Sequence, residues 1–136
     1  MRPRRVQCPS PSVHGFDSLA EISNESHNSL VERLLGEALR LERHSLLRFR
    51  SGASGRREPY LTGTRLLVRQ VVAQLGDSRG AAGEVADYLG IERPFELAAR
   101  DYYADFGAEI DVDEEWAASV EASEHARWER QQAALA

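Results

Sequence analysis

Residues 34–50, LLGEALRLERHSLLRFR, carry the pattern that decides the predicted fold of this chain. Their apolar residues recur every three or four positions, which is the spacing of one face of an amphipathic α-helix. The face that this spacing defines comprises Val31, Leu35, Ala38, Leu46 and Phe49. We therefore predict a first long helix from about Ser26 to Arg50, with Ser26 or Asn28 as its N-cap.

Further helices are predicted downstream from apolar spacing and from the positions of proline and glycine. Pro59 and Pro94 each suit the first turn of a helix, because proline lacks an N–H that would be unsatisfied there in any case. The glycines after Leu75 predict a break near Asp77, followed by a short helix that ends at Leu89. The main predicted helices after the first cover residues 59–75, 94–106 and 112–134. The expected fold is all-α, an antiparallel four-helix bundle with short loops.

Length and composition predict one folded domain with a basic N-terminal tail. A chain of 136 residues with 42% hydrophobic and 29% charged residues is ordinary for one globular domain. Residues 1–15 contain three prolines and little apolar content, so we expect a disordered tail before a domain over residues 16–136. Cys8 alone makes no disulfide framework, and no apolar stretch resembles a signal peptide or membrane span, so a cytoplasmic protein is expected.

The charge distribution is uneven along the chain although the net charge is only −5. Residues 33–79 contain ten Arg and four acidic residues, whereas residues 84–136 contain fourteen acidic residues and four Arg. Two interpretations are open: the halves pack together through complementary surfaces, or the basic half binds an acidic protein or a nucleic acid. All 17 basic residues are arginine, which a GC-rich genome would explain.

Two glutamates fall on predicted apolar faces and are the first candidates for a site. Glu42 lies seven residues after Leu35 and seven before Phe49, and Glu96 lies seven before Tyr103. A carboxylate that faces a core is costly unless it is paired, protonated or bound to a metal ion. Both residues are therefore candidate ligands, with pairing to a nearby Arg as the plain alternative.

This recurrence resembles the ferritin-like superfamily, which includes bacterioferritins and rubrerythrins. The stretch LLGEALRLERHSLLRFR is similar to a first helix of that family, and residues 122–132, ASEHARWERQQ, are similar to the end of a fourth helix. The resemblance implies a helical bundle whose core holds two iron ions through Glu and Glu-x-x-His ligands. The chain departs from that pattern, because Ala122 precedes His125 by three residues and the second helix offers no histidine.

The resemblance therefore implies a degenerate or absent di-metal site in a protein that acts as an accessory or interaction module. Glu121 and His125 are four residues apart and can share a helix face. If a metal is held, the expected ligands are Glu42, Glu96, Glu121 and His125, a set that suits iron or manganese. Without a metal, the same helices would form an adaptor.

A second resemblance concerns residues 84–91, EVADYLGI, which are similar to the first helix and turn of a helix-turn-helix. The helix after Pro94 would then read DNA, but it carries Glu96, Asp101 and Asp105 against Arg100, which disfavours phosphate contact. The alternative function is thus a non-metal adaptor that binds an acidic protein or nucleic acid through the Arg-rich first half. A homodimer or a protein partner is expected, since the aromatic residues exceed what one small core needs; they are Tyr102, Tyr103, Phe106, Trp116 and Trp128.

Overall fold

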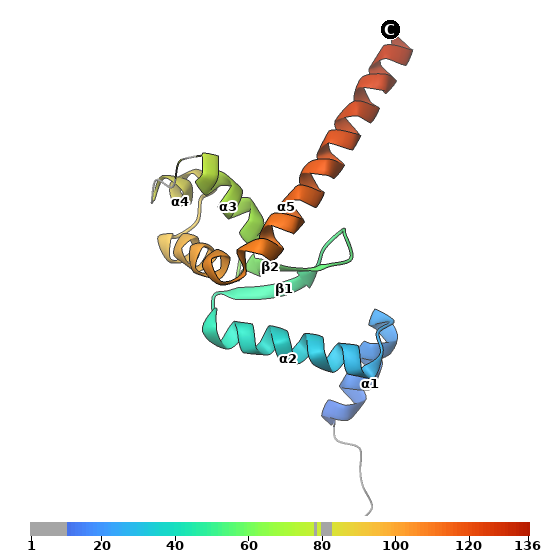
Figure 1. Ribbon diagram of the computed structural model, residues 1–136, viewed down its shortest axis with the longest axis vertical. Helices are drawn as coiled ribbons and strands as arrows, with labels where there is room; N and C mark the ends of the chain where they lie inside the picture. Colours follow the sequence, from blue (N-terminus) through green and yellow to red (C-terminus); the bar gives the residue numbers. More distant parts are fainter. Residues whose placement is uncertain (1–10, 78, 80–82) are drawn as a thin grey trace, which may run out of the picture. The chain divides into compact units, whose positions relative to one another are not determined.

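The computed structural model describes residues 11–77, 79 and 83–136, which form five helices and one two-stranded sheet (Figure 1). The elements are α1 (Pro11–Ser23), α2 (His27–Arg43), β1 (Leu47–Ser51), β2 (Arg57–Leu61), α3 (Val68–Asp77), α4 (Glu84–Leu89) and α5 (Arg93–Leu135). They divide into two compact units, residues 1–40 and residues 41–136. None of these helices is long and apolar enough to cross a membrane. Of the predicted tail, residues 1–10 lie outside the description and Pro11–Gly15 belongs to α1.

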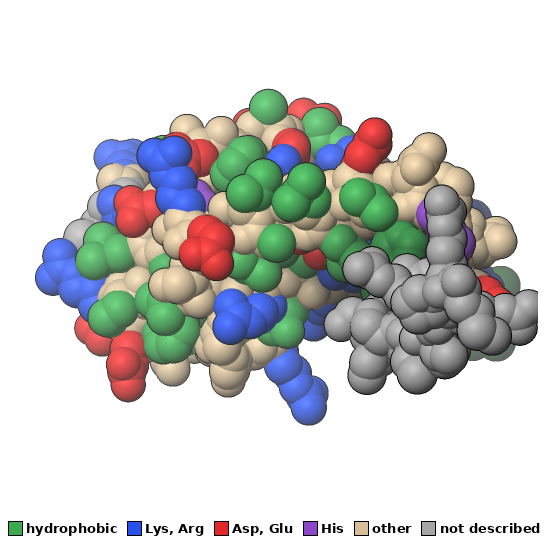
Figure 2. All heavy atoms as spheres, turned by 90° about the horizontal axis from the view of Figure 1, so that it is seen from below, with side chains coloured by type: hydrophobic (Ala, Val, Ile, Leu, Met, Phe, Trp, Pro, Cys, Tyr) green, Lys and Arg blue, Asp and Glu red, His purple; other side chains and the backbone are tan. Residues whose placement is uncertain are grey.

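The first unit contains α1 and most of α2. The hydroxyl of Ser26 accepts a hydrogen bond of 3.2 Å from the Ser29 N–H, which confirms the predicted N-cap of α2. Arg33 Nε lies 3.0 Å from Glu25 Oε1, and Leu30 is fully buried. The part of the predicted apolar face that lies in this unit is exposed: the exposed fraction is 49% for Val31 and 58% for Leu35, and Ala38 is exposed as well. Exposed hydrophobic side chains stand among charged ones on the face shown in Figure 2.

The second unit begins with a β-hairpin where the sequence predicted helix. Strands β1 and β2 pair antiparallel, with Leu47 opposite Leu61 and Arg48 opposite Tyr60. Leu47 is fully buried and Arg48 is exposed, so this segment alternates with the period of a strand. The helix predictions over residues 44–50 and 59–67 are wrong, because pairing between β1 and β2 makes strands of most of the first stretch and of the start of the second.

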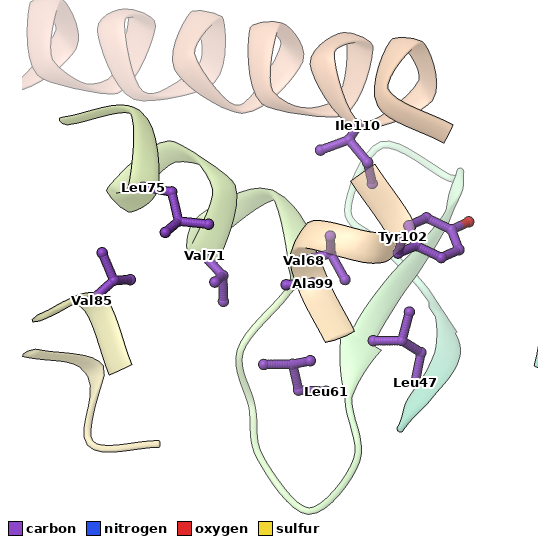
Figure 3. Packing of buried hydrophobic residues seen from close by; sticks show 9 residues of the cluster. All are labelled: Leu47, Leu61, Val68, Val71, Leu75, Val85, Ala99, Tyr102 and Ile110. Atoms are coloured by element: carbon purple, nitrogen blue, oxygen red, sulfur yellow. The ribbon is translucent and has the colours of Figure 1, made fainter. Parts of the chain in front are cut away.

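Helices α3, α4 and α5 close over the hairpin around one hydrophobic core. Figure 3 shows the nine buried side chains of this core, which come from both strands and from all three helices. The members are Leu47, Leu61, Val68, Val71, Leu75, Val85, Ala99, Tyr102 and Ile110. The predicted break near Asp77, the short helix that ends at Leu89 and the helix start at Pro94 are confirmed.

Helix α5 bends once and then continues as a helix that is exposed to solvent. Phe106 has non-helical backbone angles, φ −132° and ψ 30°, inside the run Arg93–Leu135. The predicted end at Phe106 is therefore a kink, after which the helix resumes without a loop. From residue 118 to the C-terminus every residue is exposed except the half-buried Ala126. We call residues 118–135 the α5 arm; it extends away from the strands and from α3 (Figure 1).

These elements contradict the expected ferritin-like four-helix bundle. The fold of the second unit is a hairpin packed against three helices, and the described chain contains a sheet that a bundle lacks. The bundle prediction is wrong because it depends on a first helix that reaches Arg50. The observed helix α2 ends at Arg43, and most of the stretch predicted as its last two turns pairs with β2 instead.

Candidate functional site

The four predicted metal ligands occupy different surroundings in the structure. Glu42 is exposed near the end of α2 and lines a shallow surface hollow with Leu41, Ser45 and Arg48. Glu96 is fully buried. Glu121 and His125 both belong to the exposed α5 arm.

The contacts of His125 are local to the arm. Its Nε2 lies 3.2 Å from Glu129 Oε1, one turn later, and its ring stacks on Trp128 at a centroid distance of 6.0 Å. Within residues 11–77, 79 and 83–136, no three or more His, Cys, Asp or Glu side chains are grouped so that they could hold a metal ion. The structure therefore offers the predicted set no common centre.

Glu96 has a structural task that accounts for its burial. Its Oε2 accepts hydrogen bonds from the backbone N–H groups of Ala86 (3.0 Å) and Gly83 (3.3 Å), which open helix α4. Its Oε1 lies 3.3 Å from Arg100. The carboxylate thus caps a neighbouring helix from a distance in sequence, satisfying N–H groups that a helix start leaves without intrahelical partners. An inward-facing glutamate was expected here, and capping is the role the structure gives it.

The most concentrated positive charge of the described chain lies on the hairpin and the turn after it. Residues 43–69 contain seven Arg and one acidic residue. Arg48, Arg50 and Arg65 are exposed, and none of them has a carboxylate within ion-pairing distance in the described part of the chain. We call these three residues, with Tyr60, the basic hairpin surface.

Local structure positions this surface. The Arg50 guanidinium carbon lies 5.7 Å from the centroid of the Tyr60 ring, within the range of a cation–π contact. Arg48 donates through Nη1 to the carbonyl oxygen of Leu47 at 2.7 Å, which holds its stem against the start of β1. In the turn after β2, Thr64 Oγ1 donates to the Leu61 carbonyl oxygen (2.9 Å), so the turn that presents Arg65 is also fixed.

Ion pairs formed by two other arginines, one in the hairpin loop and one on α3, anchor the hairpin to α3 and α5. Arg56 Nε lies 2.8 Å from Asp113 Oδ1 on α5, and Arg69 on α3 bridges Glu58 (3.2 Å) and Glu114 (3.1 Å). Asp113 is 4% exposed, and this burial raises the pKa of its carboxyl, with Arg56 acting in the opposite direction. These ion pairs fix the hairpin to α3 and α5, and the arginines that form them are different from the unpaired ones.

The helix-turn-helix resemblance has a structural counterpart. Helix α4 ends at Gly90, which adopts a left-handed conformation (φ 67°), and α5 begins at Arg93. Glycine suits this position because left-handed angles cost it nothing. The exposed surface of the second helix nevertheless carries Asp101 and Asp105, so its charge opposes contact with phosphate.

A histidine that the sequence did not single out fixes the corner before β1. His44 is buried, and its Nε2 lies 2.9 Å from Asp105 Oδ2, with Arg43 Nε 3.4 Å from the same oxygen. Its ring meets Tyr102 edge-on at 5.1 Å. A surface hollow of about 260 Å³ adjoins this corner. The pair ties the α2–β1 corner to α5, and only the tertiary fold brings its members together across 61 positions.

No family model matches the sequence, and neither the curated proteins nor the solved structures yielded a match. The evidence for function is therefore the geometry of the chain itself. The sequence had marked the Arg-rich first half but did not separate paired from unpaired arginines. The signal that would have located them is the alternation Leu47-Arg48-Phe49-Arg50, which places both arginines on one side of a strand.

Proposed function

We propose that this protein is a nucleic-acid-binding module that contacts the phosphate backbone through the basic hairpin surface. The observation that carries the proposal is the exposure of Arg48, Arg50 and Arg65 without carboxylate partners among the described residues. Five other arginines do pair with acidic groups, namely Arg33, Arg43, Arg56, Arg69 and Arg100. The three arginines of the surface thus keep their charge available for a partner, and they lie on one strand and the turn after its neighbour.

The chemistry of the surface suits phosphate. A guanidinium presents a planar fork of N–H donors that matches phosphate oxygens in a bidentate way. A two-stranded antiparallel ribbon fits the major groove of B-form DNA, and an aromatic ring beside an arginine provides a stacking surface for an exposed base. Tyr60 and Arg50 supply such a pair on this hairpin. An acidic protein would use the same charges but would gain less from the ring.

Nucleic acid binding is disfavoured in the sequence analysis only for the acidic helix after Pro94. That helix is the first part of α5, whereas the basic hairpin surface lies on other elements. In the proposed arrangement the hairpin approaches the phosphates and the Asp101 side of α5 stays away from them. Contacts to phosphate position a protein but carry no sequence information directly. We therefore expect binding that depends strongly on salt and weakly on sequence.

The test is fluorescence anisotropy of a labelled random-sequence duplex titrated with the full chain at several salt concentrations. We expect the variant Arg48→Gln/Arg50→Gln to bind at least about tenfold more weakly near 0.1 M salt. The slope of log affinity against log salt should fall by about 0.9 for each phosphate that the variant no longer neutralises. Arg79→Gln/Arg93→Gln removes the same number of charges from exposed positions outside the hairpin and outside the α5 arm, and it should change binding little.

Three results would overturn the proposal. The first is no binding by the wild type at low salt, and the second is equal weakening by Arg79→Gln/Arg93→Gln and by the hairpin variant. The third is binding to poly-glutamate but not to a duplex of equal charge, which would assign the surface to an acidic protein. Circular dichroism of each variant confirms that the fold is retained, which is expected because both hairpin side chains are exposed.

A further inference from the structure

Among the described residues of the second unit, the α5 arm is exposed along its length apart from Ala126, although its sequence is not that of a purely solvated helix. Trp128 is 55% exposed, Leu135 is 83% exposed and Val120 is 39% exposed. An isolated helix of this length is marginally stable in water, because most helical stability in proteins comes from packing of one face. The arm therefore has both the surface and the energetic reason to pair with another element.

Six residues of the arm occupy positions that are symmetric about its middle. Each lies three or four positions from at least one other, so the six share one side of the helix. They are Val120, Glu124, Arg127, Trp128, Gln131 and Leu135. Reversing the helix about the point between Arg127 and Trp128 exchanges Val120 with Leu135, Glu124 with Gln131 and Arg127 with Trp128. Each exchange matches groups that attract: two aliphatic side chains, a carboxylate with an amide, and a guanidinium with an indole.

Charge favours the antiparallel orientation over the parallel one. The first part of the arm carries Glu121 and Glu124, and the second part carries Arg127 and Arg130 with Glu129 between them. In an antiparallel pair Arg130 of one copy lies within about one residue rise, roughly 1.5 Å along the axis, of Glu124 of the other. A parallel pair would instead place each of these charged residues beside the same residue of the other copy. Like charges at one level of a helix pair oppose association.

We infer that two copies of this chain associate through an antiparallel pairing of their α5 arms, with the twofold axis between Arg127 and Trp128. The paired region from Val120 to Leu135 is about 24 Å long at 1.5 Å per residue. A contact of this length lies near the roughly 1,000 Å² of total buried surface that a specific association needs. The dimer is accordingly a weak one that forms at micromolar concentrations.

Sedimentation velocity of the full chain, from low to high micromolar concentration, tests the association. The wild type is expected to shift from monomer to dimer, and Trp128→Ala should weaken the dimer about tenfold or more. Leu135→Glu should do the same, and it lies too far from the core to affect folding. Ala122→Ser lies on the opposite side of the arm and should leave the association unchanged. A monomer at every concentration, or a dimer that survives both Trp128→Ala and Leu135→Glu, would overturn the inference.

Disulfide mapping tests the orientation. In a chain that carries Val120→Cys, Leu135→Cys and Cys8→Ser, mild oxidation should join position 120 of one copy to position 135 of the other. Disulfides between two positions 120 or two positions 135 indicate a parallel pair and would sink the antiparallel arrangement. An Ala122→Cys chain in the same Cys8→Ser background should not cross-link. Neither readout uses nucleic acid, so failure here is distinct from failure of the proposed function.

Discussion

At the scale of single residues, Asp113 makes the stability of the second unit depend on pH. Its burial raises the pKa of the carboxyl from the ordinary value of 3.8, while Arg56, 2.8 Å away, lowers it by less. The folded protein therefore binds this proton more readily than the unfolded chain does. The contribution to stability is complete below the ordinary pKa and is lost as pH rises through the folded pKa.

We expect Asp113→Asn to remove this dependence. The free energy of unfolding of the variant, relative to the wild type, should increase as pH rises from about 3 to 6, where a perturbed Asp titrates. Urea denaturation of both proteins across that range measures the difference. Asp101→Asn, at an exposed position, serves as the control and should give a curve parallel to the wild type. Parallel curves for Asp113→Asn as well would contradict the burial argument.

The two glutamates that the sequence singled out show what residue patterns can and cannot predict. Glu96 was expected to face inward and is fully buried, because its helix spacing was read correctly. Glu42 was placed on the same kind of face but is exposed, because the helix on which that face depended ends one residue later. The partners of Glu96, the N–H groups of Gly83 and Ala86, belong to a separate helix and no local pattern reveals them.

At the scale of elements, the hairpin depends on one close approach between its loop and β2. A Cβ atom added at Gly52 would overlap the carboxylate of Glu58, which is the group that Arg69 holds. Gly52→Ala must therefore displace Glu58 and loosen the link between the hairpin and α3. We expect a loss of about 1–3 kcal/mol in the free energy of unfolding, the usual cost of overpacking.

The matched control is Gly36→Ala, a helical glycine whose added Cβ meets no neighbouring atom. It should stabilise by about 0.5–1 kcal/mol, since alanine favours a helix over glycine. Chemical denaturation of the two variants beside the wild type gives both numbers. Equal effects of the two substitutions would show that the Glu58 contact has no energetic role.

The helices after the hairpin could be predicted from sequence because their boundaries carry strong local signals. Gly90 ends α4, and Pro94 lies in the first turn of α5. The strands were missed because each is only five residues long, and Leu46, Leu47 and Phe49 satisfy helical spacing as well as alternation. Pairing between β1 and β2 decides that ambiguity, and pairing is a tertiary fact.

At the scale of the whole molecule, charge segregation along the chain was visible in the sequence, but its meaning was not. Composition showed a basic half and an acidic half. The structure shows that arginines on α3, on the hairpin loop and at the end of α2 are occupied by acidic partners. Arg48, Arg50 and Arg65 of the basic hairpin surface lack such a partner among the described residues, and so does the exposed Arg79 outside the hairpin. Counting charges by segment therefore overstated the basic face and could not locate it.

The second unit contains the whole of the main hydrophobic core. All nine residues of the main hydrophobic core lie after residue 41, so a fragment of residues 41–136 contains every group that the core needs. We expect this fragment to fold alone. Circular dichroism on heating should show one cooperative unfolding transition. Leu61→Ala in the fragment should cost about 2–5 kcal/mol, because it removes a fully buried side chain.

In the full chain, Leu39→Ala changes an exposed leucine of the first unit and should leave the thermal transition of the second unit unchanged. A fragment without a cooperative transition would mean that residues 1–40 are part of the second unit's folding, and the two-unit description would fail.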